Sequence, residues 1–247
     1  MKNETLLISG ASSGIGQATA LLLAKQGRNI IITGRRAERL EQLKSLLEKA
    51  GANVLIGSFD IRDRAATEAF VNSIPDAFKR IRVLVNNAGL AAGLSPMQDG
   101  DPDDWDQMMD TNVKGLLYLS RAVIPLMEDV EGAQIVNISS IAGKEVYPNG
   151  NVYCASKHAV DALTRAMRID LLPKGIRVSS VSPGMVETEF SIVRFKGDTE
   201  RAASVYSGLE PLLPEDIAEN IRYIIESPFR ITIADILVLP AAQGASR

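Results

Sequence analysis

The chain has 247 residues, of which 46% are hydrophobic and 23% are charged, and its net charge is −3 at pH 7. These values are ordinary for a globular protein with a buried core, and they argue against nucleic acid or an anionic membrane surface as a partner. One cysteine, Cys154, excludes an internal disulfide framework, and one histidine, His158, excludes a multi-histidine metal site and disfavours a Ser-His-Asp hydrolase.

The chain begins with a strand and a glycine-rich turn. Its start, Met1–Glu4, lacks the pattern of a signal peptide, and no apolar run approaches the roughly 18 residues of a membrane span, so we expect a cytoplasmic protein. Thr5–Ile8 is typical of a buried strand, Ser9–Gly16 of the turn and Gln17–Gln26 of a helix. The unpaired N–H groups and positive dipole at a helix start suit a pyrophosphate, although a flexible turn has the same composition.

The second predicted strand, Asn29–Thr33, is followed by the basic residues Arg35 and Arg36 after Gly34. An acidic residue at the end of this strand binds the ribose 2′-OH of NAD, whereas arginines accommodate the 2′-phosphate of NADP. The arginines therefore favour NADP as the cofactor. The alternative is a solvated basic start to the helix Ala37–Ala50.

The third predicted strand, Val54–Phe59, ends at Asp60 and Ile61. Ligands of open α/β sheets bind at this edge, so Asp60 is a candidate acceptor for the adenine amino group. The alternative is that Asp60 caps the helix Arg64–Phe78, a role for which Asp63 is better placed.

The fourth predicted strand, Arg82–Val85, runs into Asn86–Gly89, whose small and amide side chains allow a dinucleotide to lie close to the backbone. A plain turn is the alternative. After the polar loop 91–101, a long helical region extends from Pro102 to about Met127 and contains Asn112. A mid-helix asparagine that opens the helical ladder indicates a functional irregularity, whereas one that is simply exposed, the commoner case, carries no such meaning.

The fifth predicted strand, Ala133–Ile138, ends in Ser139-Ser140, and a helix follows over Asn151–Leu172. Tyr153 and Lys157 lie four residues apart and so share one face of this helix. A neighbouring ammonium lowers the pKa of a phenol, and the pair can then exchange a proton with an alcohol. Such a spacing also arises by chance about 0.2 times in a chain of this composition, so its neighbours decide.

The last part of the chain contains the predicted strands Ile176–Val181 and Ile231–Leu239 and the helix Pro214–Glu226. Alternating strands and helices predict a single-domain Rossmann fold over residues 1–247, with a doubly wound, seven-stranded parallel sheet flanked by helices. The residues singled out above come after the first to the sixth strand. The carboxyl ends of the strands form the ligand-binding side of such a sheet. The stretch from about 185 to 213 fits a substrate lid.

The motifs together resemble those of the classical short-chain dehydrogenase/reductase family over essentially the whole chain. The resemblance is carried by a glycine-rich turn, an Asn-Asn-Ala-Gly run, a Tyr-x-x-x-Lys pair, a serine upstream of it, a helical asparagine and a Pro-Gly pair: Ser9–Gly16, Asn86–Gly89, Tyr153 with Lys157, Ser140, Asn112, and Pro183 with Gly184. Three further stretches are similar to the branch of NADP-dependent 3-hydroxy acid dehydrogenases: Asn151–Tyr153, Pro183–Phe190 and Val193–Asp198.

The resemblance implies reversible hydride transfer between an alcohol carbon and the nicotinamide of NADP. It makes Tyr153 the general acid/base, Lys157 the group that lowers its pKa and holds the nicotinamide ribose, Ser140 a donor to the substrate oxygen and Asn112 the holder of a relay water. It also implies a homotetramer through the two long helices. The cofactor-binding residues that we expect are Gly10, Ser12, Ser13, Gly14, Ile15, Gly16, Arg35, Arg36, Asp60, Ile61, Asn87, Ala88, Gly89, Tyr153, Lys157, Pro183, Gly184, Val186 and Thr188.

The branch acts on small 3-hydroxy acids such as serine, allo-threonine and 3-hydroxyisobutyrate, whose carboxylate needs a cation. Arg194 and Lys196 are the candidates, and the alternative is that they face solvent or the cofactor phosphate. The other expected pocket residues are Ser140, Ile141, Tyr147, Asn149, Met185 and Phe190. Two other functions remain open: a broader ketone or 3-oxoacyl reductase on the same fold, and a catalytically silent NADP-binding sensor.

Overall fold

A computed structural model gives the fold and describes residues 4–206 and 208–246. Within these residues seven parallel strands form one sheet in the order β3-β2-β1-β4-β5-β6-β7. The strands are β1 Thr5–Ser9, β2 Asn29–Gly34, β3 Asn53–Ser58, β4 Ile81–Asn86, β5 Gln134–Ile138, β6 Arg177–Pro183 and β7 Asp235–Val238. The order reverses between β1 and β4, and in open α/β sheets this reversal opens a ligand crevice at the carboxyl ends of the strands.

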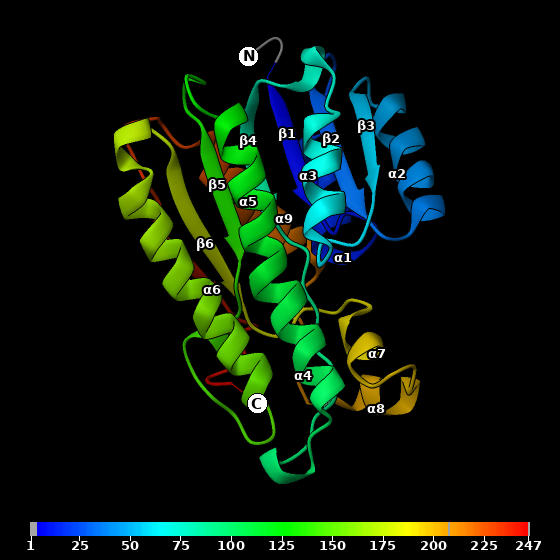
Figure 1. The fold of residues 1–247 in the computed structure, drawn as a ribbon. Coiled ribbons are helices and arrows are strands. Elements are labelled where there is room, and N and C mark those ends of the chain that lie inside the picture. The colour runs from blue at the N-terminus through cyan, green and yellow to red at the C-terminus, as the bar shows by residue number, and fades with distance from the viewer. Residues whose placement is uncertain (1–3, 207, 247) are drawn as a thin grey trace.

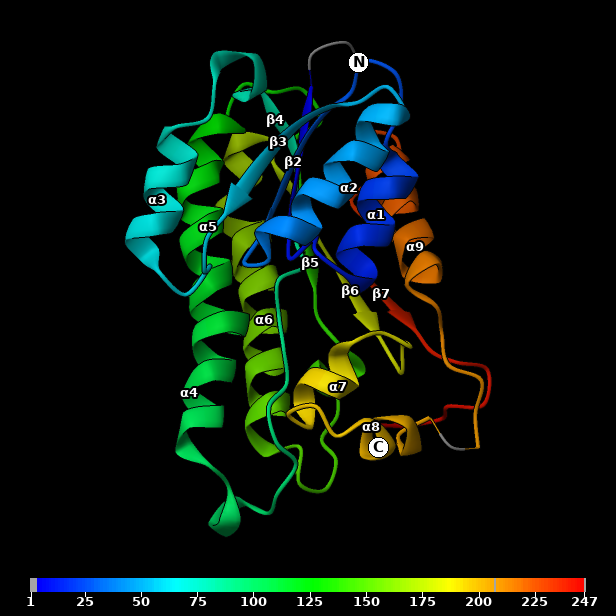
Figure 2. The ribbon, with the colours of Figure 1, turned by 90° about the vertical axis from the view of Figure 1, so that its right-hand side faces the viewer.

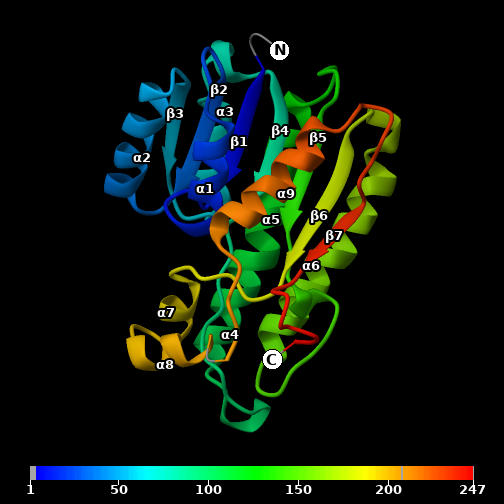
Figure 3. The ribbon, with the colours of Figure 1, turned by 180° about the vertical axis from the view of Figure 1, so that it is seen from behind.

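Helices cover both faces of the sheet. In Figure 1 one layer lies in front of it and consists of α3 Arg64–Asn72, α4 Pro102–Met109, α5 Leu116–Val123 and α6 Asn151–Asp170. Figure 3 shows the opposite layer, which consists of α1 Gly14–Leu23, α2 Ala37–Lys49 and α9 Pro214–Glu226. The short helices α7 Phe190–Arg194 and α8 Thr199–Ser204 lie beyond the carboxyl ends of the strands, as the side view in Figure 2 shows.

The side chains of each strand alternate between two hydrophobic cores. On β1, Leu6 and Ile8 pack in the core that α1, α2 and α9 close, whereas Leu7 packs in the core that α3 and α5 close. All three side chains are buried. Because both faces of the sheet are covered, the central strands β1, β2 and β4 each contain an uninterrupted apolar run, which makes them visible in the sequence.

The fold confirms the predicted class and strand order along the chain, and it corrects several boundaries. The helix predicted over Arg64–Phe78 ends at Asn72, because Ile74 precedes Pro75 and the residue before a proline disfavours helical backbone. The first helix begins at Gly14 and not at Gln17. The last strand is confined to Asp235–Val238, where it pairs with β6.

Three predictions touch residues that the structure does not describe. The start Met1–Asn3, Ser207 of the expected lid and the terminal Arg247 lie outside the described residues.

Among the described helices, none combines the length and apolar character needed to cross a membrane. The part of the chain that the structure describes also contains no cluster of three or more His, Cys, Asp or Glu side chains suited to a metal ion.

Candidate active site

A cavity of about 480 Å³ opens at the carboxyl edge of the sheet. Its walls come from the turns after β1 to β6 and from α6. The predicted site residues that line it are Gly10, Ser12, Ser13, Gly14, Ile15, Arg35, Arg36, Asp60, Ile61, Asn87, Ala88, Gly89, Ser140, Tyr153, Lys157, Pro183, Gly184, Val186, Thr188 and Phe190. The topology therefore brings together residues that are spread over most of the chain.

The glycine-rich turn is held against the turn after β4. The amide nitrogen of Asn87 donates to the backbone oxygens of Ser9 at 2.9 Å and Gly10 at 3.0 Å. A Cβ on Gly10 would lie 2.8 Å from the Cα of Ala88, and a Cβ on Gly16 would lie 2.5 Å from the Asn87 amide nitrogen. Gly16 does not line the cavity and is required by this close packing, whereas Gly10 also has a φ of +65°.

The basic end of the cavity is built on Arg36. Its guanidinium donates to the hydroxyls of Ser12 and Ser13, at 2.7 to 3.2 Å, and to the carboxylate of Glu189 at 2.7 Å. Arg39 donates to the other carboxylate oxygen of Glu189. Arg35 points elsewhere, with its guanidinium 4.0 Å from the carboxylate of Asp60. The two predicted arginines thus both line the cavity but have different partners.

Asp60, the candidate acceptor for adenine, is bound by its neighbour Arg62. The Arg62 guanidinium donates to both carboxylate oxygens of Asp60 at 2.7 to 3.1 Å. This hydrogen bonding lowers the pKa of Asp60 below its ordinary value. Asp63, and not Asp60, caps α3 by accepting from the backbone N–H of Ala66 at 3.0 Å.

Tyr153 and Lys157 lie on the buried face of α6, with exposed fractions of 8% and 6%. The Lys157 ammonium is 6.0 Å from the centre of the Tyr153 ring and donates to the backbone oxygen of Ile138 at 3.0 Å. Burial lowers the pKa of Lys157 to about 8, and burial also raises the pKa of Tyr153. The surrounding protein residues therefore raise the pKa of Tyr153 and do not lower it as expected, because the effect of burial is larger than that of the nearby positive charge.

Ser140 and Ser139 have different roles at the end of β5. Ser140 forms a side-chain hydrogen bond with Tyr153 that acts to lower the tyrosine pKa. It also accepts from the backbone N–H of Ala142 at 3.1 Å, which caps the short turn Ile141–Gly143. The hydroxyl of Ser139 instead donates to the backbone oxygen of Lys157 at 3.4 Å. Of the two serines, Ser140 is the one hydrogen-bonded to the phenol.

Asn112 lies in a π-helical segment, Asp110–Gly115, between α4 and α5. Its buried side chain accepts from the backbone N–H of Leu90 and donates to the backbone oxygen of Leu90, both at 2.8 Å. It also donates to the hydroxyl of Ser156 at 3.0 Å. The asparagine therefore joins the loop after β4 to α6. Of the two alternatives left open by the sequence, the structure shows the irregular helix and not the exposed asparagine.

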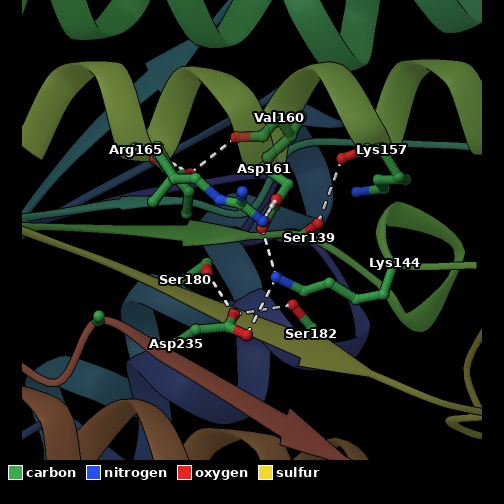
Figure 4. A network of polar contacts seen from close by, with 12 residues as sticks. Ser139, Lys144, Lys157, Val160, Asp161, Arg165, Ser180, Ser182 and Asp235 are labelled. Carbon is green, nitrogen blue, oxygen red and sulfur yellow. Dashed lines mark hydrogen bonds and ion pairs between the residues drawn. The ribbon is translucent and has the colours of Figure 1, made fainter.

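A charged network joins the loop after Ser140 to α6 and β7 (Figure 4). The Lys144 ammonium contacts the carboxylate of Asp161 on α6 and that of Asp235 on β7, the latter at 3.0 Å. Asp161 also pairs with Arg165, and Asp235 accepts from the hydroxyls of two serines of β6, Ser180 and Ser182. The network fixes the serine-bearing loop relative to the helix that carries Tyr153.

A second cavity, of about 260 Å³, meets the first at Tyr153. Arg194 lines it, and the central carbon of its guanidinium is 5.5 Å from the ring centre of Tyr147, 5.7 Å from that of Tyr153 and 5.9 Å from that of Phe195. Its Nε donates to the backbone oxygen of Gly93 at 3.2 Å. Arg194 therefore holds a positive charge in an aromatic surround beside the phenol.

The remaining candidates for the substrate pocket lie at different distances from Tyr153. Lys196 also lines the second cavity, but its exposed ammonium pairs with Asp101 at 3.3 Å and Asp104 at 3.0 Å. Asn149 lines the same cavity, and Phe190 packs edge-on against Tyr153 with ring centres 5.6 Å apart. Met185 is not among the residues that line either cavity.

The chain matches the family model described as short chain dehydrogenase over residues 4–198. It belongs to the short-chain dehydrogenase family. This short-chain dehydrogenase is 43% identical to sulfoacetaldehyde reductase 2 of Chromohalobacter salexigens over 99% of its own length and 97% of that protein. It is also 43% identical to an NADP-dependent 3-hydroxy acid dehydrogenase of Salmonella typhi, over 97% of its own length and 96% of that protein.

A solved structure with a similar fold is the closed form of serine dehydrogenase complexed with NADP⁺. It superposes with a TM-score of 0.91 at 39% identity and covers 97% of this short-chain dehydrogenase and 96% of that chain.

Sequence reasoning missed several side chains of this short-chain dehydrogenase site. Glu189 and Arg39 complete the cluster on Arg36, and Ser156 holds Asn112. Arg39 lies outside the motifs singled out above, whereas Glu189 and Ser156 lie within the quoted stretches Pro183–Phe190 and Tyr153–Lys157 but were given no role there. Cys154 is buried in the small hydrophobic core that contains Tyr153, and His158 is exposed.

Proposed function

We propose that the chain is an NADP-dependent oxidoreductase that interconverts the alcohol and carbonyl forms of small 3-hydroxy acids such as serine, allo-threonine or 3-hydroxyisobutyrate. The observation that carries the proposal is Arg194, whose guanidinium lies 5.7 Å from the ring centre of Tyr153 where the two cavities meet. A substrate whose hydroxyl reaches Tyr153 has its other end beside this cation. Arginine pairs with a planar carboxylate through two parallel hydrogen bonds.

The reaction needs a proton acceptor, a donor to the substrate oxygen and a hydride acceptor. Bound NADP⁺ would supply the last, because its nicotinamide ring is a hydride acceptor. Tyr153 takes the hydroxyl proton, and Ser140, hydrogen-bonded to the phenol, donates to the developing oxygen. Lys157 would provide the positive charge behind the tyrosine and would hold the ribose, and Asn112 would order a water that connects Lys157 to solvent.

The residues around the first cavity fit a dinucleotide cofactor that carries a 2′-phosphate. The start of α1 and the glycine-rich turn line the cavity and suit the pyrophosphate. Arg36, with the hydroxyls of Ser12 and Ser13 beside it, suits the 2′-phosphate that distinguishes NADP from NAD. The NADP-dependent name of the Salmonella typhi relative and the NADP⁺ in the serine dehydrogenase structure support the same cofactor.

A second candidate substrate carries a sulfonate. In serine, in 3-hydroxy acids and in sulfoacetaldehyde alike, one carbon separates the oxygen-bearing carbon from the acid group. The similarity to sulfoacetaldehyde reductase 2 favours this candidate. The positive charge of Arg194 beside Tyr153 suits a sulfonate as well as a carboxylate. The broader ketone reductase and the silent NADP-binding sensor lack a comparable observation in their favour.

The test is a substrate panel with matched arginine and lysine variants. Serine, the threonine isomers, 3-hydroxyisobutyrate, 3-hydroxypropionate, 2-hydroxyethanesulfonate and a plain secondary alcohol are each offered with NADP⁺ and with NAD⁺. We expect the acids to react with NADP⁺ and Arg194→Gln to raise their KM about 10- to 100-fold, the loss of a charge-assisted pair. Lys196→Gln removes the same charge from a residue already paired with Asp101 and Asp104 and is expected to change KM less than about 3-fold.

Three outcomes would contradict parts of the proposal. Reaction of only the uncharged alcohol would remove the assignment of Arg194 to an acid group. Equal or better turnover with NAD⁺ would contradict the assignment of NADP as the cofactor. A larger effect of Lys196→Gln than of Arg194→Gln would show that Lys196 binds the acid group of the substrate.

The proposal extends to the lid and to the assembly. Residues 185–213 carry Val186, Thr188 and Arg194 into the two cavities, which supports a lid that closes over the substrate. We further propose a cytoplasmic homotetramer built through α4–α5 and α6, on the pattern of the family. Light scattering of the purified protein measures the assembly, and a monomer would contradict it.

A further inference from the structure

Glu189 closes the cluster of charges at the basic end of the first cavity. It directly precedes α7, and its two carboxylate oxygens accept from Arg36 Nη1 at 2.7 Å and from Arg39 Nη1 at 2.5 Å. The arginines belong to the start of α2, which is 150 or more residues earlier in the chain. Two hydrogen bonds therefore fasten the expected lid to the rim of the cofactor cavity.

The donors that hold Glu189 are the ones that suit a 2′-phosphate. Arg36 sits between the hydroxyls of Ser12 and Ser13 and the carboxylate of Glu189. Hydrogen bonds from Arg36, and then from Arg39, lower the pKa of Glu189 below its ordinary value, so the side chain is an anion at neutral pH. A phosphate and a carboxylate on the same guanidinium groups repel each other, and each weakens the binding of the other.

We propose that Glu189 is an internal competitor of the cofactor 2′-phosphate for Arg36 and Arg39, and that a phosphate which takes these arginines releases α7. The inference rests on the proposed NADP dependence. It makes Glu189 a residue that sets both the affinity for the phosphorylated cofactor and the freedom of the lid.

The position of α7 gives the release a consequence at the substrate. Phe190, next to Glu189, packs edge-on against Tyr153, and Arg194, at the other end of the same helix, lies beside Tyr147 and Tyr153. The five residues of α7 thus connect the basic end of the cofactor cavity to the substrate end. Movement of Glu189 away from the arginines shifts both side chains that face the phenol.

A purely structural role for Glu189 predicts the opposite sign. If the carboxylate only holds Arg36 and Arg39 in place for the phosphate, its removal leaves the arginines less ordered and weakens NADP⁺ binding. Competition predicts tighter binding instead. The variant Glu189→Gln separates the two, because glutamine keeps the size of the side chain and loses its charge.

The first experiment measures the dissociation constants of NADP⁺ and NAD⁺ by titration calorimetry on the full chain. For Glu189→Gln we expect the Kd of NADP⁺ to fall about 3- to 10-fold, the range of two exposed ion pairs, and the Kd of NAD⁺ to stay within about 2-fold. Glu187→Gln is the matched control, because it removes the same charge from an exposed position two residues away. It is expected to change neither constant more than about 2-fold.

Two results would overturn the inference: weaker or unchanged NADP⁺ binding by Glu189→Gln, and equal tightening of NADP⁺ and NAD⁺. The titration of the wild-type chain tests the cofactor separately. If it binds NAD⁺ as tightly as NADP⁺, the proposed cofactor fails. If it prefers NADP⁺ and Glu189→Gln does not tighten that binding, only the role of Glu189 fails.

The second experiment follows the lid itself with adenosine 2′-phosphate, a probe that carries the phosphate without the nicotinamide. We expect saturating probe to speed hydrogen exchange of the α7 amides in the wild-type chain and to leave their exchange unchanged in Glu189→Gln. Exchange at α7 that does not respond in the wild type, while the probe binds, would contradict the coupling.

Discussion

Burial acts in opposite directions on the two ionisable groups of α6 that face the first cavity. It lowers the pKa of Lys157 and raises the pKa of Tyr153, so both side chains are pushed towards their neutral forms. The spacing of the two residues predicts that they are neighbours, because four positions make about one helical turn. It does not predict the balance of charge, since desolvation depends on the strands and loops that pack over the helix.

Tyr153→Phe tests the acid/base role at the scale of one hydroxyl. We expect kcat to fall about 10²- to 10⁴-fold, the usual contribution of a placed general acid/base, with the Kd of NADP⁺ within about 2-fold. The measurement is steady-state turnover together with cofactor titration. Tyr223→Phe, at an exposed tyrosine of α9, is the control and is expected to leave kcat unchanged. Full turnover by Tyr153→Phe would contradict the mechanism.

The pKa of Lys157 has a consequence for stability as well as for chemistry. Its folded value of about 8 lies below its ordinary value of 10.5, so between these pH values the unfolded chain binds more protons than the folded chain. The contribution of this group to the free energy of unfolding therefore rises with pH from 8 to 10.5. The neutral variant Lys157→Met lacks this contribution.

The comparison of the wild type with Lys157→Met isolates this group from other titrations. We expect the difference in the free energy of unfolding, wild type minus variant, to increase by about 3 kcal/mol between pH 8 and 10.5, which is the pKa shift converted to energy. Urea unfolding of the two chains without cofactor measures it. A difference that stays constant with pH would show that Lys157 is not desolvated.

At the scale of elements, the π-helical segment around Asn112 is the irregularity that the sequence could indicate. An asparagine within a long helical pattern is unusual, and the structure shows that it is buried where the helical ladder opens. Its partners could not be read from the sequence. Asn112 bonds to the backbone of Leu90 in the loop after β4 and to the hydroxyl of Ser156 on α6, and both partners lie far from it in the chain.

The network around Lys144 yields a prediction at the same scale. Lys144→Met leaves the buried Asp161 with one cationic partner, Arg165, and we expect a loss of about 1–3 kcal/mol in the free energy of unfolding. The control Lys174→Met breaks an ion pair with Glu128 between half-exposed side chains and should cost less than about 1 kcal/mol. Urea unfolding compares the two.

Lys144→Met also loosens the loop that follows Ser140, so kcat should fall more than KM rises. Equal losses of stability in the two lysine variants would mean that the network is solvated and does not hold this loop.

At the scale of the whole molecule, the fold follows from alternation and burial. Apolar strands separated by helical segments predict the parallel sheet, and the position of polar residues after strands predicts the ligand edge. Most residues of the first cavity are therefore predictable from the sequence. The role of Glu189 is not, because its partner Arg36 is 153 positions away in the chain. Arg194 and Lys196 are equivalent in the sequence, because only the fold places Asp101 and Asp104 beside Lys196.

The two cavities lie at the carboxyl ends of the strands, which leaves the turns at the amino ends of the strands open to engineering. A flexible insertion of about eight residues between Glu128 and Asp129, both exposed in the turn before β5, should keep kcat/KM within about 2-fold, because loop closure costs little. The same insertion between Leu94 and Ser95, which line the second cavity, should abolish turnover of the acids. Initial rates on both insertion proteins decide this. Tags, fusion partners and immobilisation chemistry therefore belong at the turns that precede the strands.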